Sequence, residues 1–237
     1  KSQPDPLDLA GFGLPIMGRT TVVRPGSNLG PAGGFALGLA TFLEDRSFTH
    51  AWLMDDDCYP EAAALGLLVE RAATMRKGSV VYPAAVYEAT GEAMNYLGWS
   101  GALIDRLAVQ MAGLPMAELF WWAEDTEYLQ HRLPRKSVVS ARVDESRILY
   151  DLGRRTDDKP AWKYYYEVRN DIWFRTRAEG CAHLGRLIRT LIRQLGSALL
   201  RHGSPEKVAM YFRGLVDGVT GRLGVRVVPP TKAAAQQ

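Results

Sequence analysis

Apolar and polar positions along the chain follow two alternating periods, and this pattern predicts a succession of strands and helices. Short apolar segments bounded by turn residues predict buried strands, whereas longer segments with one apolar face predict helices. We expect strands over Thr20–Val23, Ala51–Met54, Ser79–Tyr82 and Ser137–Val143, helices over Phe35–Leu43, Pro60–Thr74, Ala102–Met111, Glu124–Arg132 and Cys181–His202, a turn-rich loop over Arg24–Gly34 and a mobile polar loop over Asp144–Lys159. Short connections between alternating strands and helices predict an α/β fold whose sheet carries helices on both faces.

Two regions are expected along the chain. Residues 1–170 contain the alternating pattern and are predicted to form the α/β domain, and residues 171–230 are predicted to be a helical, basic extension. Within the extension, the segment Cys181–His202 has apolar residues at i, i+3, i+4 and i+7 spacing, and Arg186, Arg189 and Arg193 share another face. This segment is therefore predicted to be a basic amphipathic helix.

The composition places the chain among ordinary folded proteins. Of its 237 residues, 47% are hydrophobic and 23% are charged, which excludes disorder as the main state. No apolar run is long enough to span a membrane, and the first residues lack the pattern of a secretory signal. The cysteines, Cys58 and Cys181, have no CxxC partner, so we expect two free thiols and a reduced, cytoplasmic protein.

Charge is distributed unevenly around a formal net charge of +3. Between Asp171 and Arg226 there are ten Arg or Lys residues and four Asp or Glu residues. Such a region suits nucleic acid or an anionic membrane, but its arginines are not interleaved with aromatic residues that could stack on bases, so we expect no nucleic-acid partner. The arginine face of the predicted helix suits a peripheral site on the inner face of the plasma membrane, while its apolar stripe is predicted to pack into the core.

Three consecutive aspartates, Asp55, Asp56 and Asp57, follow directly after the predicted strand Ala51–Met54. In extended backbone Asp55 and Asp57 point to the same side, where both could contact a divalent cation bound to phosphate oxygens. Like charges this close repel one another, and a cation would relieve the repulsion. The alternative is a solvated acidic turn that caps the next helix. The triplet by itself does not decide between them.

A second cluster combines aromatic and acidic residues in the segment from Phe120 to Asp125. Trp121 and Trp122 could bury the apolar face of a sugar ring, and a carboxylate of Glu124 or Asp125 could accept the proton of an attacking hydroxyl. The alternative, which base rates favour for this segment alone, is that both tryptophans are core residues and the two acids begin a helix.

The glycine-rich segment Asn28–Phe35 is a candidate anion site. Glycines let backbone N–H groups approach a phosphate at the start of a helix, and Asn28, Gly33 and Gly34 would take part. The segment lacks the Walker lysine and the GxGxxG spacing, so it could equally be a tight turn.

Taken in order, these motifs resemble the family 2 glycosyltransferases, and within them the rhamnosyltransferase and galactofuranosyltransferase branch. The resemblance covers about residues 20–225. It is carried by Asn28-x-Gly30-x-Ala32-Gly33-Gly34, Trp52-Leu53-Met54-Asp55-Asp56-Asp57, Gly113-Leu114-Pro115, Phe120 with Glu124-Asp125-x-Glu127-Tyr128, Tyr165-x-x-x-Arg169-Asn170, and Leu215-Val216-Asp217-Gly218 with Gly221.

The resemblance implies a GT-A fold, with a Rossmann-type nucleotide-binding sheet, and an inverting transfer of sugar from a nucleotide donor. It implies that Asp55 and Asp57 engage Mg²⁺ or Mn²⁺ and the donor diphosphate, and that Asp56 lies near the ribose. It further implies that Asp125 is the catalytic base. Trp121, Trp122 and Glu124 would hold the acceptor.

Two departures from the family pattern stand out. Relatives usually carry a histidine ligand after the strand that follows the base; here the matching position is Asp144, an acceptable oxygen ligand for Mg²⁺ or Mn²⁺. The family's first strand and helix, which hold the nucleotide base, would precede residue 1.

The resemblance therefore predicts an enzyme that moves rhamnose, galactofuranose or a similar sugar from a UDP- or dTDP-linked donor to a glycan or lipid-linked acceptor in cell-envelope polysaccharide synthesis. The alternative from another class is a non-catalytic relative that retains the fold as a binding module. Glycoside hydrolysis also uses paired carboxylates beside aromatic residues, but it gives no reason for three aspartates at a strand end.

Overall fold

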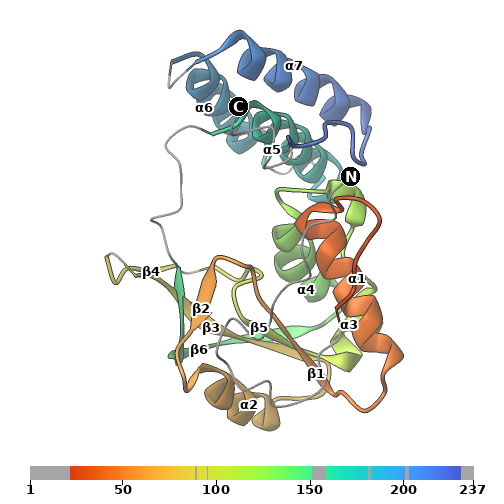
Figure 1. The fold of residues 1–237 in the computed structure, drawn as a ribbon, viewed down its shortest axis with the longest axis vertical. Coiled ribbons are helices and arrows are strands. Elements are labelled where there is room, and N and C mark those ends of the chain that lie inside the picture. The colour runs from red at the N-terminus through yellow and green to blue at the C-terminus, as the bar shows by residue number, and fades with distance from the viewer. Residues whose placement is uncertain are drawn as a thin grey trace.

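The computed structural model describes residues 22–88, 90–94, 96–150, 159–180, 183–200 and 203–230. They form an α/β protein in which helices surround a curled mixed sheet (Figure 1). The strands are β1 (His50–Leu53), β2 (Cys58–Pro60), β3 (Ser79–Tyr87), β4 (Ala93–Met94), β5 (Ala102–Asp105) and β6 (Val139–Tyr150). The helices are α1 (Gly30–Glu44), α2 (Ala64–Thr74), α3 (Arg106–Ala112), η2 (Ala117–Leu119), η3 (Thr126–Arg132), α4 (Leu133–Arg135), α5 (Ala161–Trp173), η5 (Phe174–Ala178), α6 (Leu184–Leu200) and α7 (Pro205–Thr220).

The sheet has the strand order β1-β5-β3-β6-β2, with β4 paired to β3. Only β3 and β6 are parallel; the other described pairings are antiparallel. These pairings make β1, β3 and β6 run in one direction, so their carboxyl ends share one edge of the sheet. The segment Asp55–Asp57, which follows β1, and Tyr150, at the end of β6, both lie at this edge.

Along β3 and β5, neighbouring side chains point to opposite faces of the sheet and therefore enter two different cores. Val80 and Ile104 face a core that α1, α3 and η3 complete, while Val81 and Leu103 face another core that Leu68 of α2 completes. Helices therefore cover both faces of the sheet, as the sequence predicts.

Several predicted boundaries are wrong, for identifiable reasons. The segment Ala102–Met111 is not one helix: Ala102–Asp105 is strand β5, because it pairs with β1 and β3 on its two sides. Of the loop predicted over Asp144–Lys159, residues 144–150 are strand instead, since β6 continues to Tyr150 through an irregularity in its pairing with β3, and residues 151–158 lie outside the described residues. Of the strand predicted over Thr20–Val23, the described residues Val22 and Val23 are not strand.

Helix boundaries differ in a similar way. Helix α1 begins at Gly30, earlier than predicted, because Pro31 is tolerated in the first turn of a helix. Helix α2 begins at Ala64, later than predicted, because Cys58–Pro60 pairs with β6. The predicted helix over Cys181–His202 is confirmed as α6, and the ends of the predicted segment lie outside the described residues.

The helices α5, α6 and α7 form a layer above the sheet region (Figure 1). They share a core of Val168, Ile172, Leu187 and Tyr211. The expected boundary at residue 170 falls inside α5, which spans both regions. Among the helices in the described ranges, none combines the length and the hydropathy that crossing a membrane requires.

Candidate functional site

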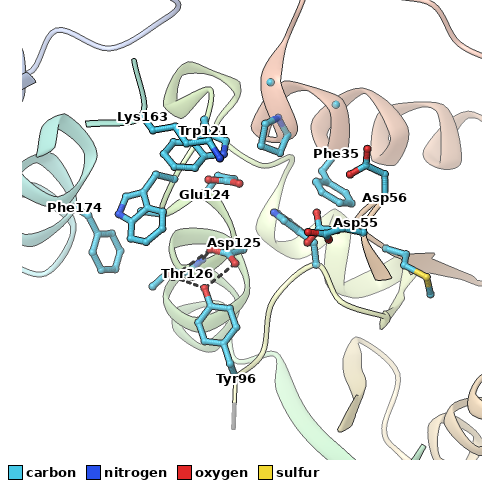
Figure 2. Close-up of a pocket in the computed structure, with 18 of the residues that line it drawn as sticks. Phe35, Asp55, Asp56, Tyr96, Trp121, Glu124, Asp125, Thr126, Lys163 and Phe174 are labelled. Carbon is cyan, nitrogen blue, oxygen red and sulfur yellow. Dashed lines mark hydrogen bonds between the residues drawn. The ribbon is translucent and has the colours of Figure 1, made fainter. Parts of the chain in front are cut away.

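A cleft of about 1090 Å³ opens at the edge of the sheet where β1 ends. Its walls come from the start of α1, the segment after β1, the segment before β5, the turn before η3, and α5 with η5. The side chains of Asp55, Glu124 and Asp125 lie around the same space, with Lys163 and Phe174 further along it (Figure 2). The tertiary structure therefore brings together the two acidic clusters that the sequence singles out.

The three aspartates enter the cleft from the end of β1. Asp56 is exposed, whereas Asp55 is half-buried. Burial, followed by the charges of Asp57, Asp125 and Asp56, raises the pKa of Asp55 from 3.8 to about 7. The charged form of Asp55 is therefore disfavoured, and a nearby positive charge would stabilise it.

Asp55, Asp57 and Cys58 each place a ligand atom within 4.8 Å of the others, close enough for one metal ion. Burial raises the pKa of the Cys58 thiol to about 12, and this thiol lies 3.6 Å from Asp57 Oδ1, to which it can donate a hydrogen bond. A protonated thiol is a poor ligand for a hard cation, whereas two carboxylates suit Mg²⁺ or Mn²⁺. The donor set therefore favours a hard cation on the two aspartates.

The opposite wall is a strained turn, Leu119–Ala123, which we call the tryptophan turn. Phe120, Trp122 and Ala123 have φ angles of 62°, 78° and 65°, a region that non-glycine residues rarely adopt. At Phe120 ψ is −63°, and Trp121 N donates to Leu119 O at 2.7 Å, which defines the rare γ-turn with positive φ.

The turn is packed directly against the start of α1. Ala32 N donates to Phe120 O at 3.2 Å, and a Cβ atom on Gly30 would lie 2.1 Å from the same oxygen. Only glycine fits at this position, which explains why the Asn28–Gly34 segment has a glycine at residue 30.

The tryptophan turn places two aromatic rings at the cleft. The ring centroids of Trp121 and Trp122 lie 5.6 Å apart, and Trp162 of α5 packs edge-on against Trp121 at 5.2 Å. Trp122 is 41% exposed, so part of its surface is available to a ligand. The alternative in which both tryptophans are core residues does not hold for Trp122.

Glu124 and Asp125 follow the turn and differ in their environments. Glu124 is only 6% exposed, and its Oε2 atom has no hydrogen-bond partner among the described residues. Burial, together with the charge of Asp125, raises the pKa of Glu124 to about 8. Glu124 is thus protonated at neutral pH and has an oxygen free for a ligand.

Asp125 is held by hydrogen bonds on both oxygens. Oδ1 accepts from Thr126 N at 2.6 Å, and Oδ2 accepts from Tyr96 Oη at 2.7 Å. Burial raises the pKa of Asp125, and the hydrogen bonds from Tyr96 and Thr126 oppose this rise. Asp125 therefore caps η3 and keeps a fixed orientation.

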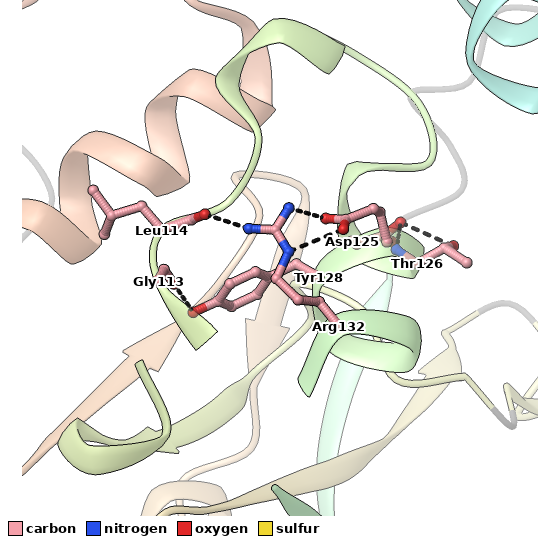
Figure 3. Close-up of polar contacts among 7 residues, drawn as sticks. Gly113, Leu114, Asp125, Thr126, Tyr128 and Arg132 are labelled. Atoms are coloured by element: carbon pink, nitrogen blue, oxygen red, sulfur yellow. Dashed lines mark hydrogen bonds and ion pairs between the residues drawn. The ribbon is translucent and has the colours of Figure 1, made fainter. Parts of the chain in front are cut away.

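Helix η3, a π-helix, is anchored to the loop after α3 (Figure 3). Arg132 binds both oxygens of Glu127, with Nε donating at 2.9 Å, and its Nη1 donates to Leu114 O at 2.6 Å. Tyr128 Oη donates to Gly113 O at 2.8 Å. The Gly113–Leu114 and Glu127–Tyr128 motifs thus meet, and they fix the helix that carries Asp125.

Sequence reasoning missed several cleft residues, among them Tyr96, Lys163 and Arg175. Tyr96 contacts Asp125, Lys163 places its Nζ atom 4.9 Å from the Trp121 ring, and Arg175 follows α5. No motif marked them, and only the packing of α5 and of the segment before β5 brings them to the cleft.

The remaining predicted residues are distributed unevenly. Asn28 and Gly34 line the cleft, but Gly33 is buried and its N–H donates to Leu29 O at 3.3 Å. Asp144 lies outside the cleft lining: its side chain is 76% exposed and its Oδ1 lies 2.8 Å from Arg142 Nε. Asp144 is therefore not brought to the aspartates that could hold a metal.

Fold and site together define an α/β protein with an acidic, aromatic cleft at the carboxyl edge of its sheet. Comparison of the sequence with models of known protein families gave no match, and comparison with curated proteins gave none either.

Proposed function

We propose that this protein is a metal-dependent inverting glycosyltransferase with a GT-A-like fold. It moves rhamnose, galactofuranose or a similar sugar from a UDP- or dTDP-linked donor to a glycan or lipid-linked acceptor in cell-envelope polysaccharide synthesis. The observation that carries the proposal is the meeting, in one cleft, of the strand-end aspartates with Glu124, Asp125 and the tryptophan pair. These segments are far apart in the sequence, and each supplies a group that such a transfer needs.

In the proposed transfer, the acceptor oxygen forms a bond to the anomeric carbon while the bond from that carbon to the donor diphosphate breaks. The hydroxyl proton passes to Asp125, whose pKa burial raises toward the range of an effective base. Glu124, protonated at neutral pH, donates a hydrogen bond that orients the acceptor, and Trp122 contacts the apolar face of its sugar.

Asp55 and Asp57 are the residues that would hold Mg²⁺ or Mn²⁺. A cation would relieve the repulsion that contributes to the raised pKa of Asp55. When bound, it supplies positive charge for the departing diphosphate, so the chain needs no general acid there. Asp144 is not included, because it lies outside the cleft lining.

Release of nucleoside diphosphate from a panel of UDP and dTDP sugars, with Mg²⁺ or Mn²⁺, tests the proposal. We expect turnover that requires the metal and is lost in Asp57→Ala and in Asp125→Ala. Unchanged turnover in both variants would show that the assigned site is wrong.

The second candidate is a non-catalytic binding module. It is favoured by the start of α1, where the N–H groups of Gly30, Ala32 and Gly33 already donate to Asn28 Oδ1, Phe120 O and Leu29 O and are not available to a phosphate. Calorimetry of UDP and dTDP with Mn²⁺ separates the two. Metal-dependent binding of both nucleotides supports the enzyme, and binding of neither supports the module.

The helix α6 supports a peripheral membrane location for the proposed enzyme. Its apolar stripe is divided: Leu187 packs in the core, but Ile188 and Ile192 are 49% and 65% exposed, and the helix contains arginines and no acidic residue. Exposed apolar residues beside arginines suit an anionic lipid surface. Co-sedimentation with phosphatidylglycerol vesicles should weaken as salt rises and when Arg186, Arg189 and Arg193 become Gln. Equal pelleting with neutral vesicles would contradict this location.

A further inference from the structure

The tryptophan turn holds three non-glycine residues at positive φ. Such a conformation is rare for non-glycine residues and persists only where the surroundings fix it. Because Glu124 and Asp125 follow immediately, the direction in which the acids point depends on whatever holds this turn.

Two buried residues of α5 contact the backbone of the turn. Asn170 Nδ2 lies 2.9 Å from Leu119 O, 2.8 Å from Trp121 O and 2.8 Å from Trp122 O. Arg169 Nη2 donates to Leu119 O at 2.8 Å and lies 3.2 Å from Glu118 O. Both side chains have no exposed surface.

Arg169 also fixes the orientation of Asn170. Its Nε atom donates to Asn170 Oδ1 at 2.8 Å, so the amide nitrogen of Asn170 faces the turn. The guanidinium lies 4.7 Å from the centroid of the Tyr166 ring, and Nη1 donates to Gly224 O at 2.6 Å. Every nitrogen of this buried guanidinium thus donates to an oxygen, as the burial of a charge requires.

The next residue of α5 holds a side chain of the turn. Trp122 Nε1 donates to Asp171 Oδ1 at 3.1 Å, and Gln194 Nε2 of α6 donates to Asp171 Oδ2 at 2.8 Å. Three consecutive residues therefore contact the turn, two at its backbone and one at its exposed ring.

We propose that Arg169, Asn170 and Asp171 form one positioning unit, which holds the tryptophan turn in its strained conformation and thereby aims Trp122, Glu124 and Asp125 into the cleft. The unit acts through the turn and is not itself catalytic. Its effect on sugar transfer rests on the proposed function, whereas its effect on the turn does not.

The test compares Asn170→Leu, which keeps the approximate size but removes every side-chain donor, with Tyr164→Phe as a matched control. Tyr164 is also buried on α5, and its hydroxyl pairs with Ser197 Oγ of α6 at 2.9 Å. Hydrogen–deuterium exchange is measured on peptides that cover residues 117–127 and on peptides of β3. Turnover and KM for the donor are measured in parallel.

In Asn170→Leu we expect exchange over residues 117–127 to accelerate by about tenfold or more, which corresponds to about 1.4 kcal/mol of local opening, while β3 stays protected. Turnover should fall with the donor KM unchanged, because the aspartates are not disturbed. Tyr164→Phe should leave exchange over the turn unchanged. If Asn170→Leu fails to fold, Asn170→Ser, which keeps a shorter donor, takes its place.

Unchanged protection over residues 117–127 in the folded Asn170 variant would overturn the proposal. So would equal acceleration in Tyr164→Phe. If the wild-type protein transfers no sugar, the proposed function fails, and the exchange result still decides whether Arg169, Asn170 and Asp171 hold the turn.

Discussion

The two acidic regions of the cleft are built in opposite ways. Asp55–Asp57 follows strand β1 after Met54, and Asp56 and Asp57 lie in the short turn that leads to β2, so the local backbone between two strands places these side chains. Glu124 and Asp125 follow a turn with three residues at positive φ, held by α5 from one side and by α1 from the other. The difference teaches that acidic side chains beside a strand end can be placed by local geometry, whereas the orientation of the acids after the tryptophan turn needs contacts from distant segments.

The electrostatic environments of the two regions follow from their construction. Asp55 is half-buried, and nearby carboxylates contribute to its raised pKa, so it is suited to a cation. Burial dominates the pKa values of Glu124 and Asp125, and Asp125 is tied to Tyr96 and Thr126, so this region is suited to proton transfer. Four predictions sharpen or break this comparison.

The largest effect is expected when one acid of each region is removed. Asp125→Asn should keep metal-dependent binding of UDP or dTDP and reduce turnover by about 10²–10⁴-fold, the usual contribution of a general base. Asp57→Ala should instead abolish metal-dependent nucleotide binding, measured by calorimetry with Mn²⁺. Asp144→Ala serves as the control and should change neither quantity, because Asp144 is exposed and paired with Arg142. Loss of nucleotide binding in Asp125→Asn would contradict the assignment of nucleotide binding to the strand-end aspartates and of proton transfer to Asp125.

The second prediction concerns the pH dependence of stability without metal. Asp55 and Glu124 have folded-state pKa values of about 7 and about 8, above their ordinary values of 3.8 and 4.5. The folded state therefore binds more protons than the unfolded state between about pH 4 and pH 8, so its stability falls as pH rises through this window. We expect a loss on the order of a few kcal/mol.

Thermal unfolding from pH 5 to pH 8, followed by circular dichroism, measures this loss. Asp55→Asn should reduce the slope of the profile to the part that Glu124 contributes, and Mn²⁺ at pH 8 should restore stability to the wild-type protein. A profile that is flat without metal would contradict the electrostatic account of the cleft.

A smaller effect is expected from Tyr96→Phe. The Tyr96 hydroxyl stabilises the charged form of Asp125, so its removal should raise the pKa of Asp125 further. The rising limb of the pH–rate profile should then move to higher pH, and turnover at neutral pH should fall by about tenfold or more, because a hydrogen bond to a charged group contributes about 1.5–3 kcal/mol. Tyr128→Phe removes a hydroxyl that donates to Gly113 O and should leave the limb in place. A shift toward lower pH in Tyr96→Phe would show that another group acts as the base.

The smallest effect is expected from Ala123→Gly, which tests the strain directly. Glycine adopts a φ of 65° without the cost that alanine has, so the free energy of unfolding should rise by up to about 1 kcal/mol. Ala40→Gly, in the interior of α1, should lower it by about 1 kcal/mol. Urea unfolding of both variants measures the two changes in the free energy of unfolding, which we expect to have opposite signs. Destabilisation by Ala123→Gly would show that the turn is not strained at this residue.

Errors in the predicted fold have a common physical origin. The apolar residues of β5 resemble part of a helix, because a strand buried on both faces shows no alternation between apolar and polar positions. The polar residues of β6 suggest a loop, yet Ser146 is fully buried and its hydroxyl donates to Ala64 O at 2.9 Å. In both cases pairing with neighbouring strands overrides the local pattern.

The sequence by itself determined the α/β class, the helix α6 and the position of three aspartates at the end of a strand, because these follow from periodicity and from the order of residues along one segment. It also marked Glu124 and Asp125 as candidates. Only the tertiary structure placed Tyr96 against Asp125, brought Asn170 and Gly30 to the tryptophan turn, and left Asp144 outside the cleft lining. These arrangements depend on contacts between residues far apart in the chain, and no local propensity encodes them.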